Sequence, residues 1–357
     1  MAAIETIGLT KRYGRGGLPI HRPGRAPAPE APPALDDLTV SVKEGEIFGF
    51  LGPNGAGKST MIRLLLGYLH PTAGRATVLG FDAVRQSVKI RKRVGYLPGG
   101  IALYDSMSGE RLLDYLGRLT GRPSTRRAAL LDRLELSERT LKRPVRDYSR
   151  GMRQKIGIIQ ALQHDPELAI LDEPTEGLDP LMQRAFYEIL HDLKRVGRTI
   201  FFSSHVLSEV ERVCDRVAIV RAGRLVALED VAALLKRRKR NVEMRLAGPP
   251  PKLAGVRGVS DIRQADGRLT LSLEGDVAPF LAAIAGAWIT DLTIEPAHLE
   301  EAFLEYYADD DTRERLGLTE KSQLAQPSGS EAAPPKPAEP AAKSAAAPPV
   351  EPPVKTS

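Results

Sequence analysis

The chain has little cysteine, few aromatic residues and no long apolar run. Its single cysteine, Cys214, excludes a disulfide framework within these 357 residues and fits a reducing compartment. Cys214 lies in a stretch with apolar periodicity, so we expect a buried structural thiol rather than a reactive one. The longest apolar stretch, Phe280 to Ile289, is about half the length of a membrane-spanning helix, and no N-terminal signal segment is visible. If the protein works at a membrane, we expect another chain to supply the spanning part.

The charge balance is basic, with a net charge of +6 and a sequence pI near 9.3. Such a balance can indicate a nucleic-acid partner. The densest basic cluster, Lys236–Arg240, has no aromatic residues among its cations and falls at an expected domain junction. We interpret it as a solvated linker, in reach of anionic lipid headgroups, rather than as a nucleic-acid patch. We therefore expect no nucleic-acid partner.

Composition divides the chain into regions. Residues 1–235 alternate short apolar strands with amphipathic helices, which predicts an α/β domain with a mainly parallel core sheet. A proline- and glycine-rich insertion, about residues 14–33, is expected to form a surface loop between two early strands. Residues 321–357 contain almost no large apolar side chains, which predicts a disordered tail.

A second, smaller domain is expected over residues 241–308. Apolar and polar residues alternate over 242–246 and 269–273, which predicts two half-buried strands. Residues 299–306 carry apolar side chains at the i, i+3, i+4 and i+7 spacing of a helix. We therefore expect a small α+β domain that ends in this helix.

The most informative segment fits the phosphate-binding pattern G-x-x-x-x-G-K-[ST]. It consists of Gly52, Pro53, Asn54, Gly55, Ala56, Gly57, Lys58, Ser59 and Thr60. A buried strand is expected before it, over Ile47–Leu51, and a helix after it, with one face formed by Met61, Leu64, Leu65 and Tyr68. In this setting backbone N–H groups and the helix N-terminus can bind phosphate oxygens. Lys58 can reach the outer phosphates and the Ser59 hydroxyl can ligate Mg²⁺, so the sequence predicts a nucleotide site.

Further polar residues stand at the ends of expected elements. Asp172 ends an apolar strand over Leu168–Asp172 and can hold Mg²⁺ beside a phosphate loop, while the adjacent Glu173 can deprotonate a water. Ser149 fits a helix N-cap, and the helix start behind it is a candidate anion site. His205 follows the expected strand Thr199–Ser204. Taken singly, Ser149 is an ordinary cap and His205 an ordinary polar residue at a sheet edge.

Taken in order, these motifs resemble the ATP-binding subunit of ABC transporters. They are the Lys58-Ser59 loop, Tyr148–Met152, Asp172-Glu173, Gly177-Leu178-Asp179 and His205. The chain looks most like the bacterial exporter ATPases of the daunorubicin-resistance type (ABC-2), whose usual ending matches Leu-Glu-Glu-Ala-Phe-Leu at Leu299–Leu304. The resemblance covers roughly residues 4–307. It implies a P-loop NTPase fold in which the ABC ATPase domain carries a helical subdomain.

The resemblance also implies roles for single residues, with ATP as the nucleotide and Mg²⁺ as the metal. Glu173 and His205 would be catalytic, His205 by contacting the γ-phosphate, and Ser59 and Asp172 would hold Mg²⁺. Tyr13 would stack on adenine. The signature residues would contact the γ-phosphate bound by the opposite subunit, and they are Ser149, Arg150 and Gly151. Asp179 would link the two sites across the dimer.

The implied partners are two. One phosphate loop and one signature per chain require a second copy or a homologous ATPase subunit to complete two sites. A separately encoded polytopic membrane permease would hold the assembly at the inner face of the cell membrane, with this chain cytoplasmic and peripheral. A soluble ABC ATPase without a permease, and a regulatory cassette with weak hydrolysis, remain alternatives. The permease would select the cargo, so the sequence leaves drugs, lipids and polysaccharides open.

The chain departs from the family pattern at two places: the signature, which reads Tyr-Ser-Arg-Gly-Met rather than Leu-Ser-Gly-Gly-Gln, and Gly99. Arg150 replaces a glycine of the signature, a replacement common in this subgroup. Gly99 follows Val94–Pro98 where the family usually places Gln or Glu, the side chain that normally touches Mg²⁺ and senses the membrane subunit. We therefore expect ATP binding to be retained and the usual coupling to the permease to be altered.

Overall fold

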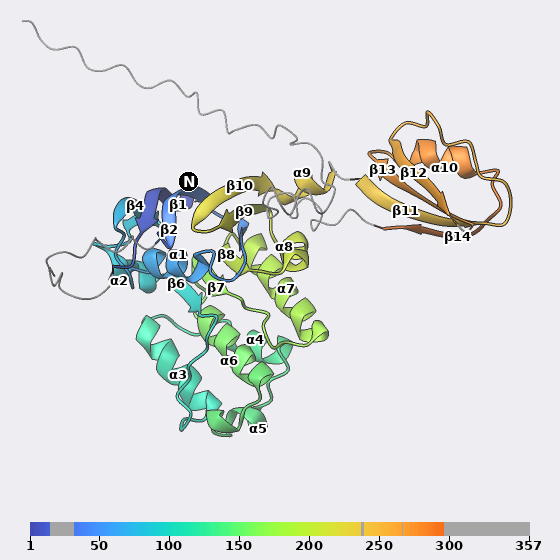
Figure 1. Ribbon diagram of the computed structural model, residues 1–357. Coiled ribbons are helices and arrows are strands. Elements are labelled where there is room, and N and C mark those ends of the chain that lie inside the picture. Colours follow the sequence, from blue (N-terminus) through green and yellow to red (C-terminus); the bar gives the residue numbers. More distant parts are fainter. Residues whose placement is uncertain (15–31, 237–238, 266, 296–357) are drawn as a thin grey trace, which may run out of the picture. The chain divides into compact units, whose positions relative to one another are not determined.

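A computed structural model describes residues 1–14, 32–236, 239–265 and 267–295 (Figure 1). The ATPase region is built on a six-stranded sheet with the order β10-β9-β3-β8-β7-β6. Its strands are β3 (Ile47–Leu51), β6 (Val94–Leu97), β7 (Leu168–Asp172), β8 (Thr199–Ser204), β9 (Arg216–Arg221) and β10 (Arg224–Asp230). All neighbours are parallel except β10, which pairs antiparallel with β9 at the edge. The predicted mainly parallel core sheet is confirmed.

The central strands are buried on both faces, as parallel strands covered on two sides must be. Alternate side chains of β3 supply two separate apolar layers: Phe48 and Phe50 face one, Ile47 and Leu51 the other. Cys214 is buried in the second layer, and burial raises the pKa of its thiol. The expected structural thiol is thus confirmed.

The first layer is covered by α1 (Lys58–Leu65) and by an antiparallel sheet with the order β2-β1-β4-β5. The strands of this sheet are β1 (Ala2–Lys11), β2 (Leu35–Lys43), β4 (Ala73–Val78) and β5 (Phe81–Asp82), with α2 (Ser87–Arg91) following. Met61, Leu64 and Leu65 are buried as predicted, but Tyr68 is not on this helix. It follows the helix end and is 55% exposed, because the αL residue Gly67 has already turned the chain.

The second layer is covered by helices. They are α3 (Gly109–Thr120), α4 (Arg127–Arg133), α5 (Glu138–Leu141), α6 (Arg150–Leu162), α7 (Pro180–Arg195), α8 (Leu207–Val213) and α9 (Val231–Lys236), with the 3₁₀ turn η1 (Val145–Asp147). Figure 1 shows α3 to α6 gathered at one end of the ATPase region. This group is the expected helical subdomain. Its longest helix, α6, carries the buried residues Ile156, Ile158 and Ile159.

The two ends of the insertion lie close together, at the ends of β1 and β2. Strands β1 and β2 are antiparallel neighbours in which Lys11 pairs with Leu35, and the backbone N–H of Ala34 donates to the Lys11 carbonyl at 2.8 Å. The expected position between two early strands is therefore confirmed. Residues 15–31 themselves lie outside the described part of the chain.

A third sheet lies in the C-terminal region and has the antiparallel order β12-β13-β11-β14. Its elements are β11 (Lys239–Leu246), β12 (Val259–Ala265), β13 (Arg268–Glu274), α10 (Ala278–Ile284) and β14 (Ile289–Ile294). Val242 and Met244 pack with Phe280 of α10 in a separate apolar core. The two predicted strands are present, and the sheet gains two strands and a helix that the sequence patterns did not predict.

The linker interpretation of Lys236–Arg240 is wrong for its last two residues. Lys239 and Arg240 begin β11, where Lys239 lies opposite Glu274 of β13. The predicted helix over 299–306 and the tail over 321–357 lie outside the described residues, and the domain boundaries stay predictions. Within those described, no helix is both long and apolar enough to cross a membrane.

Candidate active site

The nine-residue segment runs from the end of β3 into the first turn of α1, which begins at Lys58, as its pattern predicts. Gly57 has φ +103 at the helix start, and a Cβ there would lie 2.4 Å from the Ala34 carbonyl oxygen, so only glycine fits. Lys58 is buried and folds back along the loop, where its Nζ donates to the Gly52 carbonyl at 2.7 Å and the Pro53 carbonyl at 3.3 Å. The loop is therefore preformed, with the lysine amino group inside it.

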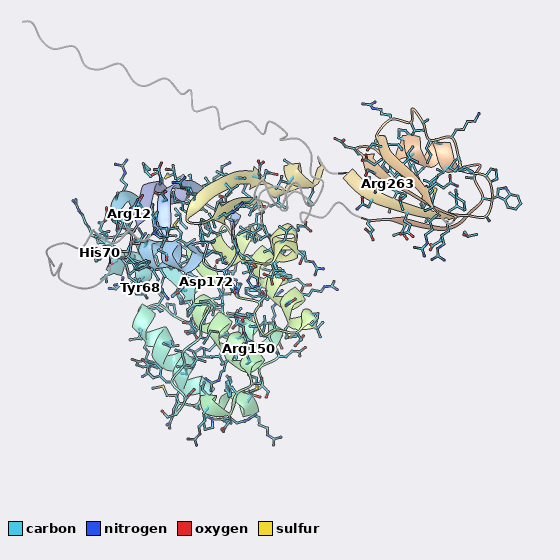
Figure 2. The ribbon with its side chains drawn as sticks, viewed as in Figure 1. Arg12, Tyr68, His70, Arg150, Asp172 and Arg263 are labelled. Carbon is cyan, nitrogen blue, oxygen red and sulfur yellow. The ribbon has the colours of Figure 1, made fainter. Side chains whose placement is uncertain are left out.

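Asp172 lies at the end of β7, beside this loop, and Figure 2 labels it. The Ser59 hydroxyl donates to its Oδ2 at 3.0 Å, and the Ser203 hydroxyl of the neighbouring β8 donates to its Oδ1 at 2.9 Å. Burial and the charge of Asp172 raise the pKa of Tyr96 to about 12. A buried carboxylate next to a serine hydroxyl offers the hard oxygen ligands that Mg²⁺ prefers.

Glu173 and His205 lie together at the ends of adjacent strands. His205 Nδ1 is 3.1 Å from Glu173 Oε1, and Lys58 Nζ is 3.5 Å from the same oxygen. The Glu173 N–H donates to the Ser203 carbonyl, and Glu173 has φ +48, a conformation that costs a non-glycine residue about 1–3 kcal/mol. Strain of this kind gathers at functional sites. The fold thus brings together three predicted site residues that are far apart in sequence.

Tyr13 stands beside the phosphate loop. Its hydroxyl is 3.3 Å from the Thr60 hydroxyl, and Lys11 Nζ lies 5.5 Å from the ring centroid. The side chain is 48% exposed, so the ring is open to a planar ligand. The adenine-stacking role stays a prediction.

The signature residues begin α6, and their contacts lie within the chain. The Ser149 hydroxyl accepts from the Met152 N–H at 3.2 Å, which confirms the predicted N-cap. Arg150, labelled in Figure 2, is 72% exposed and ion-pairs with Glu176. A Cβ on Gly151 would lie 3.0 Å from the Gly177 carbonyl oxygen. The start of α6 therefore lies close to the loop between β7 and α7, which contains Gly177.

Asp179 caps the next helix, because its Oδ1 accepts from the Met182 N–H at 2.9 Å at the start of α7. This accounts for its local role. Its predicted role across a dimer concerns a second chain and stays a prediction.

Five polar residues of the site were missed from the sequence. Gln154 of α6 donates to the Pro174 carbonyl at 2.6 Å, and Ser203 bonds Asp172 as described above. Thr175 and Ser204 both donate to Glu209. Ser203 and Ser204 close an otherwise apolar strand, and this abrupt change to polar residues is a signal that could have found them.

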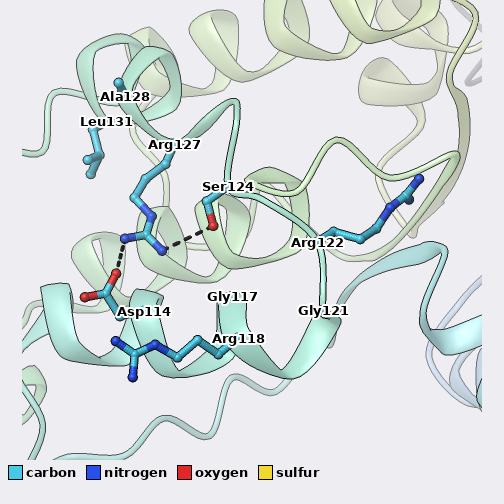
Figure 3. Close-up of a pocket in the computed structure, with 9 residues that line it drawn as sticks. All are labelled: Asp114, Gly117, Arg118, Gly121, Arg122, Ser124, Arg127, Ala128 and Leu131. Carbon is cyan, nitrogen blue, oxygen red and sulfur yellow. Dashed lines mark hydrogen bonds and ion pairs between the residues drawn. The ribbon is translucent and has the colours of Figure 1, made fainter.

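A separate hollow of about 570 Å³ lies on the helical subdomain between α3 and α4. Figure 3 shows Arg127 of α4 reaching Asp114 of α3 and Ser124. The same guanidinium donates to Gln163 at 2.7 Å. The residues that line this hollow belong to the helical subdomain, and none of the predicted site residues is among them.

Comparison with known proteins identifies the family to which this chain is similar. The family model described as ABC transporter matches residues 35–176. A solved structure, the ATP-binding subunit of an ABC transporter, superposes with a TM-score of 0.56 at 30% identity and covers 65% of this chain and 91% of that one.

Two relatives illustrate the range of the match. An ABC transporter ATP-binding protein of Synechocystis sp. is 44% identical over 207 residues, 57% of this chain and 58% of the relative. A daunorubicin resistance ATP-binding protein, DrrA3 of Streptomyces coeruleorubidus, is 35% identical over 324 residues, which is 86% of this chain and 96% of that protein. The chain belongs to the ATP-binding proteins of ABC transporters, a family of ATP-hydrolysing enzymes. Within it, the chain is similar to daunorubicin and doxorubicin resistance ATP-binding proteins.

Proposed function

We propose that this chain is the ATP-binding and ATP-hydrolysing subunit of an exporter, which dimerises to drive a separate membrane permease. The observation that carries this proposal is the meeting of Lys58, Glu173 and His205 within 3.5 Å at the mouth of a preformed phosphate loop. A degenerate regulatory cassette would have no need to keep these three groups in contact.

The chain's own residues can perform the chemistry as follows. Mg²⁺ would be held by Ser59 and Asp172 and would neutralise phosphate charge. Lys58 and the loop N–H groups bind the β- and γ-phosphates. Glu173 takes a proton from the attacking water. His205, 3.1 Å from Glu173, orients that carboxylate and is placed to donate toward the γ-phosphate.

The proposed dimer follows from the exposed signature. Arg150 is solvent-accessible and projects from the first turn of α6, whose N-terminus carries a partial positive charge. Within the described chain Arg150 pairs with Glu176, and the γ-phosphate bound by an opposing subunit could take the place of that carboxylate. A second copy or a homologous subunit would complete the site, and the arrangement is two-fold symmetric in the first case.

A surface formed by α3 and the loop before it, which carries Tyr104, supports the permease as partner. Tyr104 and Tyr115 meet edge-to-face with ring centroids 5.6 Å apart, and Leu119 follows Tyr115 by one helical turn. All three side chains are exposed, Leu119 to 65%. Aromatic residues are enriched at protein interfaces, where exposed apolar clusters mark binding sites. We propose that a cytoplasmic segment of the permease docks on this aromatic surface.

Co-purification tests the partner. Tagged chain from detergent-solubilised membranes is expected to carry a polytopic membrane protein, and Leu119→Glu is expected to lose it. Val196→Glu, at an exposed position immediately after α7, is the control and should retain it. A soluble ABC ATPase acting without a permease would be indicated if no membrane protein accompanied either the wild type or the control.

Gly99 yields a separate prediction. A Cβ on this residue would lie 3.4 Å from Asp172 Oδ2, an ordinary contact, so a side chain fits and begins beside the proposed metal ligand. We expect Gly99→Gln to lower the Mg²⁺ concentration needed for half-maximal hydrolysis, with nucleotide affinity nearly unchanged. The measurement is hydrolysis rate against Mg²⁺ concentration. Gly100→Gln is the control, because a side chain at that position meets nothing within 4 Å. Identical Mg²⁺ curves for wild type and Gly99→Gln would contradict the prediction.

A further inference from the structure

Glu209 of α8 is a buried carboxylate with no part in the mechanism described above. Its side chain is only 7% exposed. The Thr175 hydroxyl donates to its Oε1, and the Ser204 hydroxyl donates to its Oε2 at 2.6 Å. A buried charge is costly unless it is hydrogen-bonded, and here each oxygen has its own donor.

The two donors belong to the two loops that carry the site. Thr175 follows Glu173 by two residues, in the turn closed by the Leu178 N–H on the Thr175 carbonyl at 3.0 Å. Ser204 immediately precedes His205, and its hydroxyl also accepts from the Val206 N–H at 2.9 Å, so this bond spans the histidine.

One carboxylate therefore accepts hydrogen bonds from a residue close to Glu173 in sequence and from the residue next to His205, and so links the two segments that carry these side chains. We propose that Glu209 is a positioning residue for ATP hydrolysis, which fixes the separation of these two groups by holding Thr175 and Ser204 at once. The inference rests on the function proposed above for Glu173 and His205. Small displacements matter, because a shift of about 1 Å at a reacting group can lower a rate by about 100-fold.

Two substitutions separate bridging from charge. Glu209→Asp keeps the negative charge but is one methylene shorter, so it cannot reach both hydroxyls. Glu209→Gln keeps the length and removes the charge, and its oxygen can still accept from one hydroxyl while the other hydroxyl accepts from its nitrogen. If the bridge positions the site, Glu209→Asp is the more damaging change. If the charge alone mattered, Glu209→Gln would be.

The experiment measures kcat, KM and nucleotide affinity on the full chain, with melting temperature recorded for each variant. We expect Glu209→Asp to lower kcat by roughly tenfold, with KM and nucleotide affinity changed by less than about twofold. Glu209→Gln should lose less. Glu188→Asp and Glu188→Gln are matched controls on an exposed face of α7 and should behave as wild type. A loss of folded protein alone would also lower the apparent kcat at unchanged KM, so each rate is divided by the fraction of chain that binds ATP in the titration. A kcat that is still about tenfold lower after this correction supports positioning.

A second pair of variants keeps the test decisive if Glu209→Asp fails to fold. Thr175→Val removes one hydroxyl without changing the shape of the side chain, and Thr175→Ser retains the hydroxyl. We expect the valine variant to lose kcat and the serine variant to keep it. Full kcat in both Glu209→Asp and Thr175→Val would overturn the positioning role. A wild-type chain that hydrolyses no ATP, alone or with its permease, would instead contradict the proposed function.

Discussion

Replacement of Glu173 by Gln is expected to abolish steady-state ATP hydrolysis while ATP still binds. The carboxylate is the group placed to accept the proton of the attacking water, and loss of a general base costs about 100- to 10,000-fold in rate. The phosphate loop, Ser59 and Asp172 are untouched by the change. Lys58, which lies 3.5 Å from Glu173 Oε1, loses a competing anion, so ATP affinity should be unchanged or higher.

The measurement pairs phosphate release with ATP titration and with the oligomeric state in ATP. We expect an ATP-bound dimer that persists, because the event that separates the subunits no longer occurs. Glu188→Gln, the same chemical change at an exposed position, should hydrolyse ATP normally. Hydrolysis at the wild-type rate in Glu173→Gln would remove Glu173 from the mechanism.

Lys58→Ala should act earlier, on binding itself. The buried Nζ now donates to two loop carbonyls and is placed to move onto phosphate oxygens. A hydrogen bond to a charged group contributes about 1.5–3 kcal/mol, so affinity for ATP should fall by about 10- to 100-fold. Isothermal titration with ATP is the measurement.

Lys142→Ala is the matched control, since Lys142 is exposed at the end of α5 in the helical subdomain. Unchanged affinity in Lys58→Ala would count against phosphate binding by this lysine. The two site variants therefore separate the two halves of the function: Lys58→Ala impairs binding, whereas Glu173→Gln impairs only the reaction that follows.

The elements that carry local patterns were predictable. The strand Ile47–Leu51 and the turn to α1 follow from five apolar residues, a glycine-rich loop and a lysine, all within one short segment. The cap at Ser149 and the strand ending in Asp172 are equally local. These signals depend on neighbours in sequence, so the sequence alone carries them.

The C-terminal sheet shows where such patterns fail. Strand β12 is exposed or half-exposed along its whole length, so it has no alternation of apolar and polar residues to detect. It pairs with β13 through backbone hydrogen bonds that any side chain permits. Helix α10 is only seven residues long and lies within an apolar run that spacing alone cannot assign to a helix or a strand.

The hydrogen bonds that hold the site residues in place could not be predicted from sequence patterns either. Thr175 and Glu209 are 34 residues apart, and Ser203 and Asp172 are 31 apart. Neither pair forms a motif, because the contacts exist only once β7 and β8 lie side by side. Gly99 is similar: its position beside Asp172 follows from the fold, whereas the sequence showed only that a usual side chain was missing.

The backbone hydrogen bond between Ala34 and Lys11 makes this protein suitable for building a nucleotide sensor. Because the chain leaves and returns at one hydrogen-bonded point, the entropy of closing the intervening segment grows only with the logarithm of its length. Doubling the length of a flexible segment costs about 0.6 kcal/mol, so a fluorescent protein joined by flexible linkers between residues 14 and 32 is expected to leave the register of β1 and β2 in place. Tyr13 contacts Thr60 of the phosphate loop, next to one end of the splice. If Tyr13 leaves Thr60 to stack on a bound adenine, the emission of the reporter would change, although the reporter touches no catalytic group.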